Sequence, residues 1–451
     1  MEQKLRQFYN NYKTEIFFVA FCFCFYLAWA LFIPYGQGPD EDMRYDVAHF
    51  IYKYNRLPFG DEPEIVNPIW GISYAHTPIF AYQISAVFME IAALFGTPEG
   101  SLFLAARVAN VCIATGTAVF VILISHKCFV GINRFVFATL VCFLPQFVFI
   151  SSYVNNDTLA MFSTAIIFYA WILGLEKHWN LKSVLLLSVG LSFCFLSYYN
   201  AYGFILCSVI LYVGDYLINR KEWSFQKFIK FGLLIVAICA VLAGWWFIRN
   251  GIIHDGDIIG MKTSAELAEK LAKPKYKPSL HVTPQGSGYS VLGMIFGSFQ
   301  DTQWIFQTGM SFIGCFGSVN IPMGIKAYIL IGSVFGIGSI GFIVEFCKET
   351  RKKISKRGYL WCSVLILAMI IPVILSIYYS YTSDYQPQGR YVMPLLIPLI
   401  YCLTRGIGWI EKWLTRKNIK YPLGLGIIFV NSLIAVYSFC IVMGRAYLLF
   451  P

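Results

Sequence analysis

Apolar residues in this chain are gathered into long uninterrupted runs rather than spaced at helical or strand intervals. A helix needs about 20 apolar residues to cross the hydrocarbon core of a bilayer. Twelve runs approach or exceed that length, near residues 16–35, 77–95, 103–125, 134–152, 158–175, 182–199, 201–218, 229–248, 324–346, 359–381, 392–410 and 421–444. The pattern predicts an all-α protein that passes through a membrane many times.

Lysine and arginine lie in six short clusters between the runs, and such clusters mark cytoplasmic loops. They are Lys4, Arg6 and Lys13; Lys127 and Arg134; Lys177 and Lys182; Arg220, Lys221, Lys227 and Lys230; Lys348, Arg351, Lys352, Lys353, Lys356 and Arg357; and Lys412, Arg416, Lys417 and Lys420. If all twelve runs crossed, the second to sixth clusters would face the side opposite the N-terminus.

Run 77–95 is the best candidate for an apolar segment that enters the membrane without crossing. It contains Glu90, follows His76 and Pro78, and ends at the neutral stretch 96–101. Removing it from the count returns every basic cluster to one side. We therefore expect about 11 crossings, within a range of 10–13, with the N-terminus in the cytoplasm.

Two long segments then lie outside, at residues 36–102 and 249–323, within a single integral-membrane domain that covers residues 1–451. The first carries seven acids against three bases over residues 36–76. The second holds a charged stretch, 265–277, and two apolar stretches, 290–299 and 304–316, that are too short to cross. Irregular backbone at membrane depth must be covered by protein or line a watery cavity.

Composition excludes the main soluble classes. Hydrophobic residues make up 58% of the chain and charged residues 13%, with a mean hydropathy of +0.63, whereas soluble domains carry about 25% charged residues. The formal charge of +11 lies in the loop clusters rather than on one folded face, so we expect no nucleic-acid partner. Most of the 13 cysteines lie inside apolar runs, and no disulfide framework is visible.

Polar residues that interrupt apolar context recur at the outer ends of the runs. The candidates are Asp40, Glu41, Arg44, His76, Asn156, Asp157, Arg249, Gln388, Arg390 and Tyr391. A carboxylate can deprotonate a hydroxyl nucleophile, and guanidinium groups can stabilise a phosphate leaving group. Each residue also has a simpler interpretation: the acids as helix caps, the arginines as interfacial anchors, and His76 as a loop hydrogen-bonder.

Several short motifs occur in register with a known family. They are Pro39-Asp40-Glu41, His76-Thr77-Pro78, Ala106-Arg107-Val108, Val154-Asn155-Asn156-Asp157, Trp246 to Asn250 with Asp257, Ser311-Phe312 with Phe316-Gly317, and Gln388-Gly389-Arg390-Tyr391. In this order they resemble the C-type (GT-C) superfamily of polytopic membrane glycosyltransferases, and most of all an uncharacterised bacterial branch. The chain departs from the family pattern at Arg44, Thr77 and Ile313.

The resemblance implies a bundle whose first external loop carries a surface helix and a membrane-dipping helix, in a bacterial cytoplasmic membrane. It also implies inverting transfer of a sugar from a polyprenyl-phosphate carrier, such as undecaprenyl phosphate, to an extracytoplasmic acceptor. That acceptor is a cell-wall polysaccharide, a teichoic acid or another cell-envelope glycan or lipid.

The implied roles follow residue by residue. Asp40 is the base, and Glu41 orients the acceptor or replaces Asp40 as base. Donor phosphate binding falls to Arg390, Arg249 and Arg44. Further substrate contacts are expected from Asp157, His76, Asn156, Gln388 and Tyr391.

No cofactor is expected, although Asp40, Glu41 and Asp157 carry oxygen ligands that suit Mg²⁺ or Mn²⁺. The main alternative function is a non-catalytic flippase or polysaccharide-assembly protein that handles lipid-linked oligosaccharides. That alternative predicts ionisable residues deep in the membrane, whereas the runs here are almost free of charge.

Overall fold

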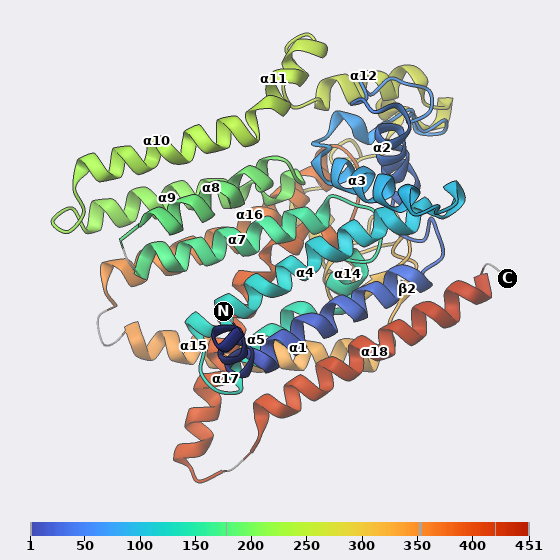
Figure 1. Cartoon of the computed structure of the whole chain (residues 1–451). Coiled ribbons are helices and arrows are strands. Elements are labelled where there is room, and N and C mark those ends of the chain that lie inside the picture. Colours follow the sequence, from blue (N-terminus) through green and yellow to red (C-terminus); the bar gives the residue numbers. More distant parts are fainter. Residues whose placement is uncertain (1, 177, 351–353, 420, 450–451) are drawn as a thin grey trace.

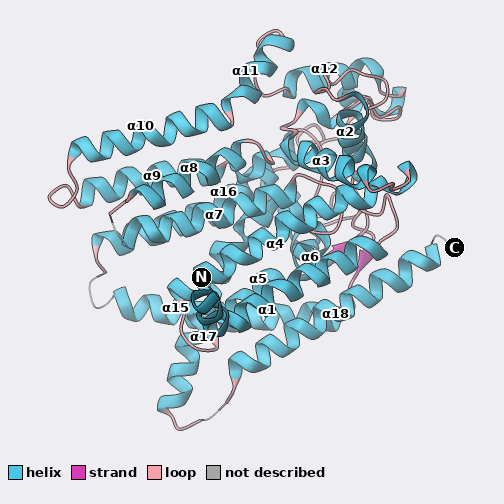
Figure 2. Ribbon diagram, in the orientation of Figure 1, coloured by secondary structure: helices cyan, strands magenta, loops and turns pink. Residues whose placement is uncertain are grey.

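The computed structural model describes residues 2–176, 178–350, 354–419 and 421–449, and the part it describes is almost entirely helical (Figures 1 and 2). The basic residues Lys177, Arg351, Lys352, Lys353 and Lys420 lie outside the described residues. The α-helices are α1 (Glu2–Phe32), α2 (Glu41–Tyr54), α3 (Phe80–Leu94), α4 (Leu102–Cys128), α5 (Asn133–Cys142), α6 (Pro145–Ile150), α7 (Asp157–Glu176), α8 (Leu181–Phe195), α9 (Gly203–Ile218), α10 (Phe225–Leu242), α11 (Gly244–Ile253), α12 (Met261–Leu271), α13 (Val291–Phe296), α14 (Trp304–Gly314), α15 (Ile325–Thr350), α16 (Lys356–Thr382), α17 (Leu396–Arg416) and α18 (Leu423–Leu449).

All twelve apolar runs are helical, and nine helices of the described chain are long and apolar enough to cross a membrane. Two further passes are shorter. One is α8, and the other is the pair α5 and α6, which is interrupted where Pro145 starts a new helix. Proline has no amide hydrogen for the preceding turn, so the run 134–152 cannot continue as one helix.

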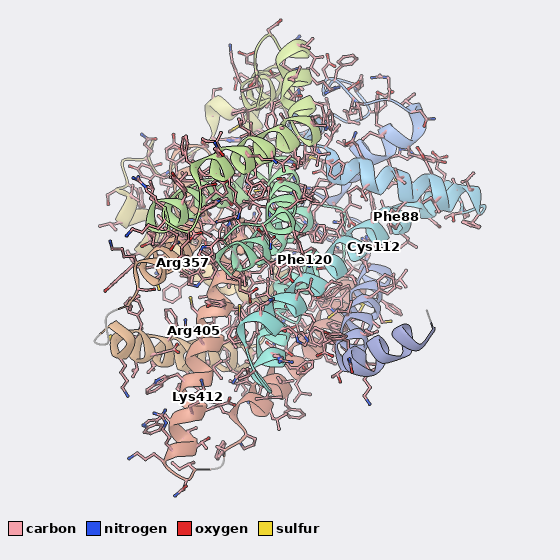
Figure 3. All side chains as sticks on the ribbon, turned by 60° about the vertical axis from the view of Figure 1, so that its left-hand side comes forward. Phe88, Cys112, Phe120, Arg357, Arg405 and Lys412 are labelled. Carbon is pink, nitrogen blue, oxygen red and sulfur yellow. The ribbon has the colours of Figure 1, made fainter. Side chains whose placement is uncertain are left out.

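The basic clusters that the structure describes gather at one end of the bundle, which we call the basic end. Ion pairs at this end join Lys127 to Glu176 at 2.7 Å and Arg357 to Asp215 at 2.8 Å. Figure 3 shows Arg357, Arg405 and Lys412 on this side of the molecule and Phe88 of α3 on the other. Their common location confirms that one side of the bundle carries the basic loops.

Helix α3 does not run from one end of the bundle to the other. At the last turn of α4, His126 Nε2 lies 2.9 Å from Glu15 Oε1 of α1, so α4 returns to the end from which α1 departs. One pass out and one pass back account for this contact, and α3 therefore starts and finishes at the opposite end. The tip of α3 exposes Leu94 and Phe95, at 85% and 86%, which suits contact with lipid. Together with α8 and the pair α5 and α6, the nine long helices of the described chain give eleven segments that run between the two ends of the bundle, and the number of membrane crossings stays a prediction.

The opposite end, called the site end, holds both long segments (Figure 1). Helices α2 and α3 belong to the first, and α11 to α14 belong to the second, which finishes with a short hairpin of β1 (Cys315–Phe316) and β2 (Ile321–Pro322). The irregular backbone after α14 is satisfied from within the bundle. Gln146 Oε1 accepts from the amide of Cys315 at 3.1 Å, and Tyr328 donates to the carbonyl of Gly314 at 2.6 Å.

Candidate functional site

Asp40 occupies the N-cap position of α2 but does not act as a cap. Its backbone is left-handed, with φ of 59° and ψ of 21°, and its side chain makes no capping hydrogen bond. The carboxylate instead accepts from Arg390 Nη2 at 2.9 Å and lies 3.8 Å from Arg44 Nη2. The helix-cap interpretation of Asp40 is therefore not supported by the geometry.

Four charged side chains form a continuous row at the site end. Arg390 pairs with Asp40, Asp40 lies next to Arg44, and Arg44 Nη1 pairs with Asp157 Oδ2 at 3.0 Å. The side chains of Arg44, Asp157 and Arg390 are 1%, 4% and 5% exposed, whereas Asp40 is 28% exposed. Asp40 is thus the member of the row most open to an incoming molecule.

The electrostatic environment keeps Asp40 ionised. Burial alone would raise its pKa, but the charges of Arg390 and Arg44 and a hydrogen bond from Tyr74 outweigh burial and lower the pKa to about 2. A carboxylate in this state is charged at every physiological pH. It is also a weak base for as long as both arginines face it.

Residues 154–157 both cap a helix and contribute a carboxylate to the charged row. Asn155 Oδ1 accepts from the amide of Thr158 at 2.9 Å, and its amide group donates to the carbonyl of Ile150 at 2.7 Å. Asn155 therefore carries out the capping that the sequence allowed for this motif. Asp157 is left to pair with Arg44, and Asn156 is buried with neither side-chain polar atom bonded to any described residue.

Further buried polar atoms without a partner among the described residues belong to the same row and its neighbours. They are the Nε atoms of Arg44 and Arg390 and the hydroxyls of Tyr82 and Tyr153. Buried polar groups in proteins are nearly always hydrogen-bonded, so a group of orphaned ones indicates a place for a ligand or water. The sequence alone does not single out these two tyrosines, because tyrosine is common in the chain.

The backbone around Arg390 is held by a close approach between two motifs. The amide of Gly389 donates to Ser311 Oγ at 2.8 Å, and a Cβ on Gly389 would lie 2.0 Å from the backbone nitrogen of Phe312. Only glycine fits there. Tyr391 accepts from Arg390 Nη2 at 3.0 Å and donates to Gln386, and Gln388 donates to the same Gln386 oxygen at 3.3 Å.

Glu41 lies beside Asp40 in sequence but is paired with Arg107 rather than with the charged row. It is fully buried, and both of its oxygens accept from Arg107, at 2.6 and 2.7 Å. Arg107 also donates to carbonyls at the end of α1. This pair acts as a clamp between α1, α2 and α4, and Arg107 is a structural residue whose partner the sequence did not reveal.

Arg249 and His76 are placed together, away from the contacts of the charged row. Arg249 Nη2 donates to the carbonyl of Pro58 at 2.5 Å, and its guanidinium lies over the ring of Trp246. The His76 ring lies 5.2 Å from that of His254 and packs against Gly60. Burial and the neighbouring His254 lower the pKa of His76. These residues join the two long segments, and within the described chain no hydrogen bond or ion pair links them to Asp40 or Arg390.

The acids considered for a divalent metal do not fit one. Arg44 lies between Asp40 and Asp157, where a cation would have to sit, and Glu41 is occupied by Arg107. No group of three or more His, Cys, Asp or Glu in the described residues is arranged to hold a metal ion. We derive no step through a metal.

The succession of helices, with two long segments at one end, defines the fold. The chain has the GT-C fold of polytopic membrane glycosyltransferases. No protein-family profile and no curated protein sequence matches it.

Solved structures share this fold at low sequence identity. The chain is similar to the oligosaccharyltransferase AglB from Archaeoglobus fulgidus in complex with an inhibitory peptide and a dolichol-phosphate, with a TM-score of 0.55, 11% identity and 97% of this chain covered. The apo form of the Archaeoglobus fulgidus oligosaccharyltransferase gives a TM-score of 0.55, 12% identity and 96% coverage of this chain. This chain spans 56% of the length of each of these archaeal chains.

The chain is also similar to ArnT from Cupriavidus metallidurans bound to undecaprenyl phosphate. The TM-score is 0.57, the identity is 11%, and the alignment covers 96% of this chain and 77% of ArnT. At these identities the likeness concerns the fold. The activity has to be argued from the site.

Proposed function

We propose that this protein is a membrane glycosyltransferase that moves a sugar from a polyprenyl-phosphate carrier to an acceptor at the site end, with inversion. The observation that carries the proposal is the row in which the partly exposed carboxylate of Asp40 is shared by two buried arginines, Arg390 and Arg44. A base and a phosphate site side by side are what the reaction needs. The fold is shared with proteins solved with dolichol-phosphate and undecaprenyl phosphate.

The reaction is a single displacement. The acceptor hydroxyl oxygen attacks the anomeric carbon, the bond from that carbon to the phosphate oxygen breaks, and polyprenyl phosphate leaves with the bonding electrons. Asp40 takes the hydroxyl proton, and Arg390 and Arg44 neutralise the charge that develops on the phosphate.

Donor binding also prepares the base. Arg390 holds Asp40 at 2.9 Å and lowers its pKa. When the donor phosphate draws Arg390 toward itself, the carboxylate loses part of that stabilisation and its pKa rises. Asp40 then accepts a proton more readily than in the free protein. The orphaned atoms of Asn156, Tyr82 and Tyr153 are candidates to bind the sugar.

We propose that the site end faces the extracytoplasmic side and that the acceptor is a cell-envelope glycan, polyol phosphate or lipid. The location of the basic clusters at the other end supports this orientation. Whether the sugar is a hexose or a pentose depends on groups that the row does not contact.

The test is release of polyprenyl phosphate from a labelled polyprenyl-phosphate sugar by the purified full chain, with and without acceptor. Asp40→Asn should abolish release while the protein stays folded, and Arg390→Lys should weaken donor binding because lysine cannot form the forked contact. Matched controls are Asp61→Asn and Arg56→Lys, which alter an acid and an arginine of the same long segment. Donor binding without release in the wild type would favour the lipid-handling alternative.

A further inference from the structure

One group of lysines is on the wrong side for a membrane protein that otherwise keeps its basic loops together. Residues 270–277 contain Lys270, Lys273, Lys275 and Lys277 and no acid. They lie in the last turn of α12 and the turns that follow it at the site end, whereas the clusters described above lie at the basic end (Figure 1). The positive-inside pattern does not account for them, so they call for another explanation.

The lysines are presented on a rigid support. Pro274 and Pro278 each begin a short 3₁₀ turn, Pro274–Tyr276 and Pro278–Leu280. The amide of Lys273 donates to the carbonyl of Ile69 at 3.0 Å, and the rings of Trp70 and Tyr276 lie 4.6 Å apart. Proline and these contacts limit the conformational entropy that a ligand would have to remove.

None of the four lysines is neutralised. Within the described chain no carboxylate lies within ion-pair distance of Lys270, Lys273, Lys275 or Lys277. The nearest acid in sequence, Glu269, accepts two hydrogen bonds from Ser279, at 2.7 and 3.0 Å. Glu269 also feels the charge of Lys277, and the four positive charges within eight residues exceed this one neighbouring acid and attract anions.

The lysine segment borders the charged row. It packs on residues 69–72, which lead directly into the 3₁₀ turn Tyr74–His76. The ring of Tyr74 lies 4.8 Å from the guanidinium of Arg44, and its hydroxyl contributes to the environment of Asp40. A polymer bound along the lysines would therefore extend toward the charged row.

We propose that residues 270–277 bind the acceptor, and that this acceptor is a polyanion, a polymer with repeated phosphate or carboxylate groups. This inference rests on the proposed function. The ring of Trp70, which is 41% accessible, forms an aromatic surface with Tyr276 between the lysines. A small aromatic surface of this kind suits a polyol or glycan chain, whereas a lipid would need a broad apolar face.

The experiment is lysine footprinting on the purified full chain in phosphatidylcholine nanodiscs, with inorganic polyphosphate as the probe. Polyphosphate should protect the lysines of 270–277 from acylation at low salt, and the protection should fade as salt is added. A quadruple variant, Lys270→Gln with Lys273→Gln, Lys275→Gln and Lys277→Gln, should bind the probe about tenfold or more weakly. The matched control changes Arg220, Lys221, Lys227 and Lys230 to Gln at the basic end and should bind normally.

Three outcomes would overturn the inference: unchanged binding by the quadruple variant, equal loss in the control, or protection that needs phosphatidylglycerol in the disc instead of polyphosphate. The last would assign the lysines to the membrane surface. Asp40→Asn should bind polyphosphate like the wild type. If binding is as expected but no sugar is transferred, the proposed function fails and the polyanion site stands. If anionic and neutral acceptors are glycosylated equally well, the acceptor assignment fails.

Discussion

The clamp between Glu41 and Arg107 gives the sharpest prediction, because both charges are fully buried. Arg107 donates two hydrogen bonds to Glu41, at 2.6 and 2.7 Å, and three more to the carbonyls of Ala30, Ile33 and Pro34, at 2.8, 2.6 and 3.1 Å. Glu41→Gln keeps the shape of the side chain but leaves a buried guanidinium without a counter-charge. Breaking one side of a buried ion pair costs about 3–5 kcal/mol.

We expect Glu41→Gln to lower the thermal stability of the purified protein accordingly, measured as the monodisperse fraction that survives heating. Turnover per folded molecule should change little, because Glu41 makes no contact with the charged row. A double variant, Glu41→Gln with Arg107→Met, should cost less than the sum of the two single variants, as coupled partners do. Asp42→Asn, at the exposed neighbouring position, is the control. Unchanged stability with lost turnover would refute this reasoning and indicate that Glu41 takes part in the reaction.

Four further predictions concern the site. Asp40→Asn should reduce turnover about 10²–10⁴-fold, the usual contribution of a general base, while equilibrium binding of the donor persists; normal turnover would exclude Asp40. A base works only when it is deprotonated, and the pKa of Asp40 in the free protein is about 2. The pH profile of kcat/KM, which reports the free protein, should therefore show no acid limb near neutral pH. Donor phosphate should engage Arg390 and raise the pKa of Asp40, so the acid limb in the pH profile of kcat should move to higher pH. If the acid limbs of kcat and of kcat/KM fall at the same pH, the coupling between donor binding and the pKa of Asp40 is contradicted. Gly389→Ala should lower the stability of the protein by about 1–3 kcal/mol or more, because the added Cβ would overlap the backbone of Phe312. Turnover of the wild-type protein should persist in excess chelator. A chelator-sensitive enzyme rescued by Mg²⁺ or Mn²⁺ would show that a metal takes part.

The placement of both long segments at one end has a consequence for substrate access. On the proposed function, a lipid-linked donor would approach from the lipid, where α3 exposes its apolar tip, and an acceptor would approach from water along residues 270–277. The charged row lies at the meeting point of the first segment and the turn that begins α17. Two substrates of opposite polarity can therefore reach Asp40 by separate routes.

Amino-acid order alone was enough to place the membrane helices. Each membrane helix depends on about 20 consecutive apolar residues, a local property, and the basic loops singled out the run at 77–95, whose helix α3 starts and finishes at the site end. Breaks within a pass were harder to foresee. The run 134–152 reads as one apolar stretch, and Pro145 divides it into α5 and α6.

The chain order also indicated that Asp40, Arg44, Asp157 and Arg390 lie at the same end of the molecule, since each follows or precedes a membrane pass. It could not say which carboxylate faces which arginine. Asp40 and Glu41 are neighbours with the same chemistry, yet Asp40 pairs with a residue 350 positions away and Glu41 with one 66 positions away. Such contacts are decided by how the helices pack, because the left-handed backbone at Asp40 turns its side chain toward Arg390 while the first turn of α2 buries Glu41 against α4.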